Sequence, residues 1–76
     1  MNFENDLEAL QTAIFETEQR IKKLEKHKES VTKELEESNS DALAETLRRL
    51  ERNLDDLHKK LAFLISERDS KNKNMI

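Results

Sequence analysis

The sequence predicts an all-α protein: an antiparallel two-helix coiled-coil hairpin that assembles into a dimeric four-helix bundle or a higher oligomer. Three observations lead to this prediction. Apolar residues, mostly leucines, recur at alternating gaps of four and three in both halves of the chain, which is the heptad spacing of a coiled coil. The chain contains no Gly and no Pro, and tight β-turns depend on those residues. Charged residues make up 41% of the chain and apolar residues 34%, whereas globular domains average about 25% and about 45–50%.

The first predicted helix covers about residues 3–37. One side of it carries the residues that we call the seam of this helix, at heptad positions a and d. They are Phe3, Leu7, Leu10, Ile14, Thr17, Ile21, Leu24, Lys28, Val31 and Leu35. Only Thr17 and Lys28 are polar. Polar residues at seam positions specify the alignment of helices at a cost in stability, and we expect these two residues to fix the register.

A turn is predicted at about residues 38–40, Ser38-Asn39-Ser40. Ser and Asn favour the N-cap of a helix, and Asn tolerates the left-handed conformation that ends one. The second helix is expected over about residues 41–69, followed by a frayed tail at 70–76. Its seam consists of Leu43, Leu47, Leu50, Leu54, Leu57, Leu61, Leu64 and Arg68. A connection this short requires the two helices to fold back antiparallel.

One register aligns the two seams. When residues are paired so that their numbers sum to 78, every a position of one helix meets a d position of the other. Leu24 then faces Leu54, and Ile21 faces Leu57. Leu50 faces the polar Lys28, so the sequence predicts that truncating Leu50 costs less stability than truncating Leu57. The whole chain is expected to form this one hairpin, with arms about 50 Å long at 1.5 Å per residue.

Most of the charge has a simple explanation as the solvated faces of two helices. Within the two predicted helices, six acid–base pairs have the i,i+4 spacing with the acid first, an arrangement that contributes about 0.2–0.5 kcal/mol per pair. They are Glu16–Arg20, Glu18–Lys22, Glu29–Lys33, Glu45–Arg49, Asp55–Lys59 and Asp56–Lys60. These pairs predict helix support rather than a binding site.

Apolar residues outside the seam gather at the open end of the predicted hairpin, where the chain starts and finishes. We call them the open-end residues: Ala9, Ala13, Phe15, Ala62, Phe63 and Ile65. Chains of 76 residues bury little of their surface, and without Cys no disulfide or thiolate metal site can compensate. Because small scaffolds of this kind need oligomerisation or a partner, we expect these residues to form an interface with another copy or with a different protein. Phe15 and Phe63 share one level of the hairpin but face opposite sides.

Basic residues form a band at mid-length, which gives an alternative function as an RNA- or DNA-binding hairpin. The basic band consists of Arg20, Lys22, Lys23, Lys26, Lys28, Arg48, Arg49, Arg52, Lys59 and Lys60. Small helical hairpins that dimerise and bind RNA have a comparable shape, which is an analogy of fold only. Acidic residues interleave with the band, no exposed aromatic residue within it offers a stacking platform, and the net charge is −3. Nucleic acid is therefore the less favoured partner, and an acidic protein surface is a further alternative partner for the band.

The predicted turn is acidic and gives a second alternative. Glu34, Glu36, Glu37, Asp41 and Glu45 surround Ser38-Asn39-Ser40. In this respect the chain resembles the coiled-coil arm of Gre-type transcript-cleavage factors, whose tip carboxylates help to hold a magnesium ion in the polymerase secondary channel. The resemblance implies a polymerase-channel effector with Asp41 and Glu45 at the tip. The tip motif of that family and its second globular domain are not reproduced in this sequence. Acids at a helix start also stabilise the helix dipole.

No pattern of residues indicates catalysis, a metal site or a cofactor. The two histidines, His27 and His58, fall on opposite flanks of the predicted hairpin, and a two-helix rod offers no concave interior for an active site. We also expect no signal peptide and no membrane helix, since the longest apolar run is Leu61–Ile65 and a span needs about 18 residues. The chain is thus expected to be soluble and cytoplasmic.

The sequence therefore favours a small non-catalytic protein–protein interaction factor. Adaptors, scaffolding or assembly chaperones and stoichiometric inhibitors are the classes that such a hairpin serves. The expected partners are the chain itself, another protein or both, with no membrane and no small-molecule substrate. Short cysteine-free chains rich in Lys, Glu and Asn are common in bacteria and their phages, and we expect such an origin.

Overall fold

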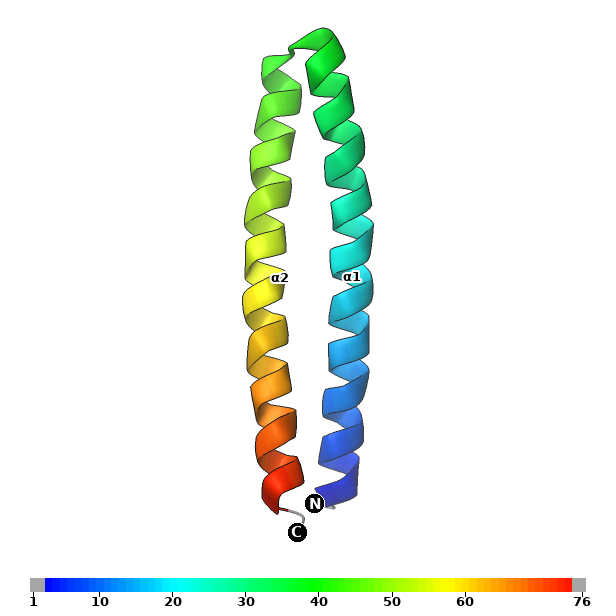
Figure 1. Cartoon of the computed structure of the whole chain (residues 1–76), viewed down its shortest axis with the longest axis vertical. Coiled ribbons are helices and arrows are strands. Elements are labelled where there is room, and N and C mark those ends of the chain that lie inside the picture. Colours follow the sequence, from blue (N-terminus) through cyan, green and yellow to red (C-terminus); the bar gives the residue numbers. More distant parts are fainter. Residues whose placement is uncertain (1–2, 75–76) are drawn as a thin grey trace.

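The computed structural model describes residues 3–74, with side chains for residues 6–72. Over this range the chain forms two α-helices, α1 at Phe3–Ser38 and α2 at Asp41–Asn74. They run antiparallel and pack against each other along their length (Figure 1). The all-helical hairpin predicted from the heptads is confirmed.

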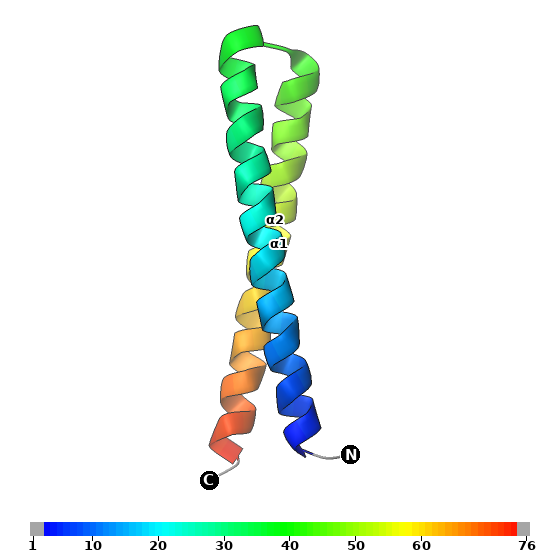
Figure 2. The same ribbon diagram turned by 90° about the vertical axis from the view of Figure 1, so that its right-hand side faces the viewer.

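The hairpin is a thin rod. Its dimensions are 56 × 18 × 14 Å, and the view turned by 90° shows the helices crossing near mid-length (Figure 2). The start of α1 and the end of α2 lie at one end, and the connection lies at the other (Figure 1). Two helices in contact leave most side chains in solvent, so binding surfaces on this molecule lie on the outside of the rod.

The buried side chains all belong to the predicted seam. Ile14, Ile21, Val31, Leu50 and Leu54 are 5–7% exposed, and Thr17 is 3% exposed. The other seam residues from Leu7 to Arg68 are half-buried. One groove is lined by Leu24 together with Asn53 and Leu57, residues that lie within about one helical turn of each other in the predicted register. The side chain of Phe3 lies outside the described ones.

The connection between the helices has the geometry that its residues favour. Asn39 adopts a left-handed backbone with φ 46°, and its N–H donates to the carbonyl of Leu35 at 2.9 Å. This is the αL form of helix C-cap, in which Asn is the usual substitute for Gly. The carbonyl of Ser40 accepts the first hydrogen bond of α2 from the N–H of Ala44 at 3.0 Å, so Ser40 is the N-cap residue.

The end of α2 differs from the sequence prediction. The helix continues to Asn74, so residues 70–74 are helical where a frayed tail was expected, and residues 75–76 lie outside the described range. Ser, Asn and Lys lower helix propensity only modestly, and no Gly or Pro interrupts the segment. The turn is also one residue shorter than predicted, because Ser38 closes α1.

The two polar residues of the α1 seam are accommodated within α1. The Thr17 hydroxyl donates to the carbonyl of Ala13 at 2.7 Å, so its polarity is satisfied without a contact across the seam. Lys28 is half-buried, and no ion pair within 4.0 Å joins it to a described carboxylate. Leu50, which faces Lys28 in the register, is 6% exposed, while Leu57 is only half-buried. Burial therefore favours the opposite order, in which Leu50 contributes more than Leu57.

Candidate interaction surfaces

The heptad geometry gives the rod two flanks. In an antiparallel pair, positions e and b of both helices border the seam on one side, and positions g and c border it on the other. One open groove is lined by Glu25, Thr32, Glu51 and His58, all at e, together with b residues such as Asp55. A second groove is lined by Arg20 and Asn53 at g and by Lys23 and Asp56 at c. The grooves therefore lie on opposite flanks.

The open-end residues divide between these flanks. Phe15 shares heptad position b with Glu29, so it lies on the flank of the first groove, with Ala62 at b and Ile65 at e. We call this side the Phe15 flank. Phe63 shares position c with Asp56 and lies on the other side, the Phe63 flank, with Ala9 and Ala13.

Phe15 and Phe63 are the exposed large apolar residues among the described side chains, at 61% and 63%. Ala9 and Ala62 are also exposed, whereas Ala13 and Ile65 are half-buried against the rod. Ala62 and Ile65 line a shallow hollow with Ser66, Asp69 and Ser70. The hairpin thus carries an apolar area on each flank of its open end.

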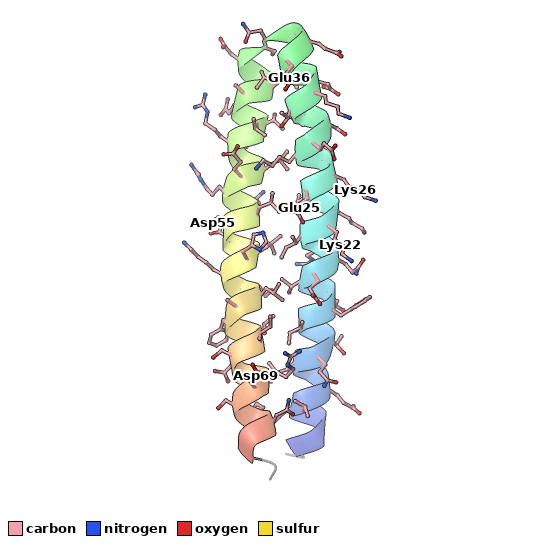
Figure 3. All side chains as sticks on the ribbon, in the orientation of Figure 1. Lys22, Glu25, Lys26, Glu36, Asp55 and Asp69 are labelled. Atoms are coloured by element: carbon pink, nitrogen blue, oxygen red, sulfur yellow. The ribbon has the colours of Figure 1, made fainter. Side chains whose placement is uncertain are left out.

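The basic band does not form one continuous surface. Arg20 and Lys23 line the groove on the Phe63 flank, beside Asn53 and Asp56. Lys22 and Arg48 occupy b positions on the Phe15 flank. Lys26 and Arg52, at f, are exposed on the outer faces of the helices, and Lys26 points away from α2 (Figure 3). The fold therefore spreads the basic residues around the rod.

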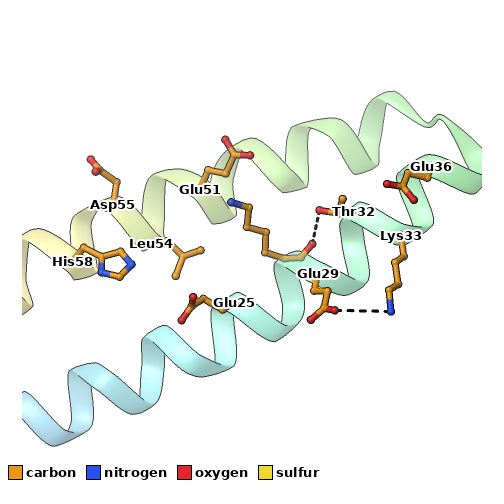
Figure 4. Close-up of a pocket in the computed structure, with 10 residues that line it drawn as sticks. Glu25, Glu29, Thr32, Lys33, Glu36, Glu51, Leu54, Asp55 and His58 are labelled. Atoms are coloured by element: carbon orange, nitrogen blue, oxygen red, sulfur yellow. Dashed lines mark hydrogen bonds and ion pairs between the residues drawn. The ribbon is translucent and has the colours of Figure 1, made fainter.

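Sequence reasoning missed an acidic groove. At mid-length on the Phe15 flank, carboxylates from both helices surround Lys28, Leu54 and His58 (Figure 4). The carboxylates are Glu25, Glu29, Glu36, Glu51 and Asp55. Along the chain these acids merely interrupt the basic band. Their heptad positions, e and b, are the signal that places them together.

Three of the six predicted i,i+4 ion pairs form. Asp55–Lys59 has an N–O distance of 3.1 Å, Glu45–Arg49 3.2 Å and Glu29–Lys33 4.0 Å. Hydrogen bonding to Asp55, reinforced by the attraction of its charge, raises the pKa of Lys59 above its ordinary 10.5. All three pairs are exposed, and such pairs contribute little to stability.

The tip is acidic and open. Glu36, Glu37, Asp41 and Glu45 are all exposed. Asp41 lies in the first turn of α2, where a carboxylate stabilises the helix dipole, and Glu45 is paired with Arg49. Among the described residues, no three His, Asp or Glu side chains are arranged to hold a metal ion.

Comparison with known proteins gives no relative. The chain matches no protein-family model, no curated protein and no solved structure at a significant level. Within residues 3–74, neither helix combines the length and the apolar character that crossing a membrane requires. Function is therefore inferred from the surfaces alone.

Proposed function

We propose that the protein is a non-catalytic protein–protein interaction element that self-associates through the open end of the hairpin. The observation behind the proposal is the exposure of Phe15 and Phe63, at 61% and 63%, on a rod only 14 Å thick. Burying a Phe side chain contributes about 1.5–3 kcal/mol, and two helices alone bury little apolar surface. Self-association would bury these exposed side chains in an interface.

The rest of the rod supports the same proposal. Apolar residues off the seam are scarce between Val31 and Leu57 and are limited to Ala42 and Ala44 near the tip. The open end therefore associates, while the tip and the mid-length faces project outward and remain available to other proteins. Scaffolding, assembly and stoichiometric inhibition all use such an arrangement.

Sedimentation equilibrium of the full chain tests the proposal. Wild type is expected to form a dimer or a higher oligomer, and Phe15→Glu combined with Phe63→Glu is expected to give a monomer of lower helicity. The matched control is Ser30→Glu combined with Ala42→Glu, which adds the same charge at exposed positions nearer the tip and should leave the oligomer intact. A wild type that is a well-folded monomer would exclude self-association and leave the apolar flanks to a foreign partner.

The nucleic-acid and polymerase-channel alternatives have weaker support. Nucleic-acid affinity depends on neutralising many phosphates together, and the basic residues are divided among both flanks and the outer faces. The tip carboxylates already have roles within α2, since Asp41 lies in its first turn and Glu45 is paired with Arg49. We therefore place protein interaction first.

A further inference from the structure

We propose that a second copy of this chain binds to the Phe15 flank, antiparallel, about a two-fold axis that lies level with Phe15. The proposal rests on the self-association proposed above and specifies which flank is used and in which register. In the register given by the heptads, each α2 residue lies level with the α1 residue whose number complements it to 78. The axis lies in the interface, perpendicular to both helices. It places α1 of the second copy antiparallel on α1 and α2 of the second copy antiparallel on α2, with the two tips pointing in opposite directions.

The Phe15 flank has an apolar centre and a charged rim. Phe15, Ala62 and Ile65 occupy the centre, and no charged residue stands at e or b between Gln11 and Glu18 on α1 or between His58 and Asp69 on α2. Protein interfaces have this anatomy, with charge depleted at the core and polar groups at the rim.

The rim charges are complementary to themselves under the two-fold operation. On α1, the axis level with Phe15 places Glu8 opposite Lys22 of the second copy. On α2, to within one residue, it places Asp69 level with His58 and Ile65 level with Ala62 of the second copy; Asp69 is also paired with Arg68 of its own chain at 3.4 Å. Glu8, Lys22, His58 and Asp69 are all exposed in the free hairpin, whereas Ile65 is half-buried. Because a two-fold interface is isologous, each of these pairs occurs twice.

The Phe63 flank suits the same operation less well. The operation places Lys60 opposite Glu67 of the second copy there, an opposite-charge pair like that on the rim of the Phe15 flank, but it also places Glu16 opposite Ala13, one residue from the level of Phe63. Glu16 is exposed in the hairpin, and a carboxylate set against a methyl group near an interface centre loses its hydration without a partner. The Phe63 flank is therefore left for other contacts.

The acidic groove is only partly covered by this arrangement. With the axis level with Phe15, the second copy reaches the level of residue 27 on α1, so Glu25, Asp55 and His58 of the groove come within the overlap, whereas Glu29 and Glu36 lie beyond it. The part of each groove nearer the tip and both tips remain exposed in the dimer.

Charge reversal measured by sedimentation equilibrium at low salt tests the register. Glu8→Lys and Lys22→Glu should each raise the dimer Kd about tenfold, because each turns two attractive rim pairs into repulsive ones. The combined variant should return to within about threefold of wild type. Glu16→Lys is the control, with the same charge change on the Phe63 flank one residue from the level of the axis, and should change the Kd less than threefold. Circular dichroism checks that each variant retains its helicity.

The outcomes separate this inference from the proposed function. A monomeric wild type overturns both. A dimer that Glu16→Lys or Phe63→Glu weakens, and that Glu8→Lys and Phe15→Glu do not, keeps self-association and overturns the Phe15 flank. A combined variant as weak as its single parents overturns the register, whereas restoration by the second reversal supports it.

Discussion

At the scale of single residues, seam leucines with the same heptad role differ in burial. Leu50 is 6% exposed although the predicted register places it opposite Lys28, and a lysine is compatible with such a position because its aliphatic stem can cover apolar surface while its ammonium stays in water. Leu57 faces Ile21 but is only half-buried. The heptad pattern gives the identity of the facing residue, and the extent of burial depends on how the flanking side chains lie.

Leu50→Ala is therefore expected to destabilise the hairpin more than Leu57→Ala. Buried Leu→Ala changes cost about 2–5 kcal/mol, with Leu57 expected at the lower end of that range. The measurement is urea denaturation at a fixed protein concentration, since self-association links stability to concentration. A larger loss for Leu57→Ala would restore the order predicted from the facing residues alone.

Lys59 gives a prediction of pH dependence. Its pKa is raised in the folded state by hydrogen bonding and attraction to Asp55. The stabilisation is therefore fully present below the ordinary pKa of 10.5 and is lost as the pH rises through the folded-state pKa. In an NMR titration of the side chain, Asp55→Asn should lower the Lys59 pKa. An unchanged value would mean that the ion pair at 3.1 Å is not maintained in solution.

At the scale of elements, the sequence predicts the helices well and their ends less well. The seam spacing locates α1 and α2 and the break between them, because the apolar period is long and uninterrupted. The end of α2 was placed five residues early, since a run of Ser, Lys and Asn disfavours a helix only weakly when no Gly or Pro stops it. Likewise, three of the six i,i+4 pairs stay open because exposed pairs gain little from closing.

The cap at Asn39 provides a test of the connection. Its φ of 46° is the left-handed region, which costs a residue with a β-carbon about 1–2 kcal/mol and costs Asn less because its short polar side chain bonds locally. Asn39→Ala should lower the free energy of unfolding by about 1 kcal/mol. Asn53→Ala, within α2, is the matched control and should be neutral or slightly stabilising. Equal effects at both positions would argue against the left-handed cap.

At the scale of the whole molecule, the sequence identifies the open-end residues but not their division into two flanks with different charge. The basic residues of segments 20–28 and 48–60 lie at similar levels of the hairpin, but their different heptad positions distribute them around the rod.

Cysteines at Leu24 and Leu54 test the hairpin itself, since facing seam positions should form a disulfide within one chain. Crosslinking only between chains, judged by denaturing electrophoresis, would indicate a domain-swapped dimer.

The distribution of charge also predicts weak binding to nucleic acid. The net charge is −3, the bases are divided among flanks and outer faces, and the Phe15 flank at mid-length is acidic. Counterion release gives affinity only when many phosphates are neutralised together, so the Kd for duplex RNA or DNA at physiological salt should stay above about 10⁻⁶ M, in the non-specific range. Fluorescence anisotropy measures this Kd.

The double variant Arg20→Glu with Lys23→Glu should weaken this residual binding no more than the control Lys26→Glu with Arg52→Glu, because neither pair of residues belongs to a continuous basic surface. If the Kd is instead below about 10⁻⁷ M, and only the Arg20→Glu and Lys23→Glu variant loses this binding, the Phe63 flank is a nucleic-acid site.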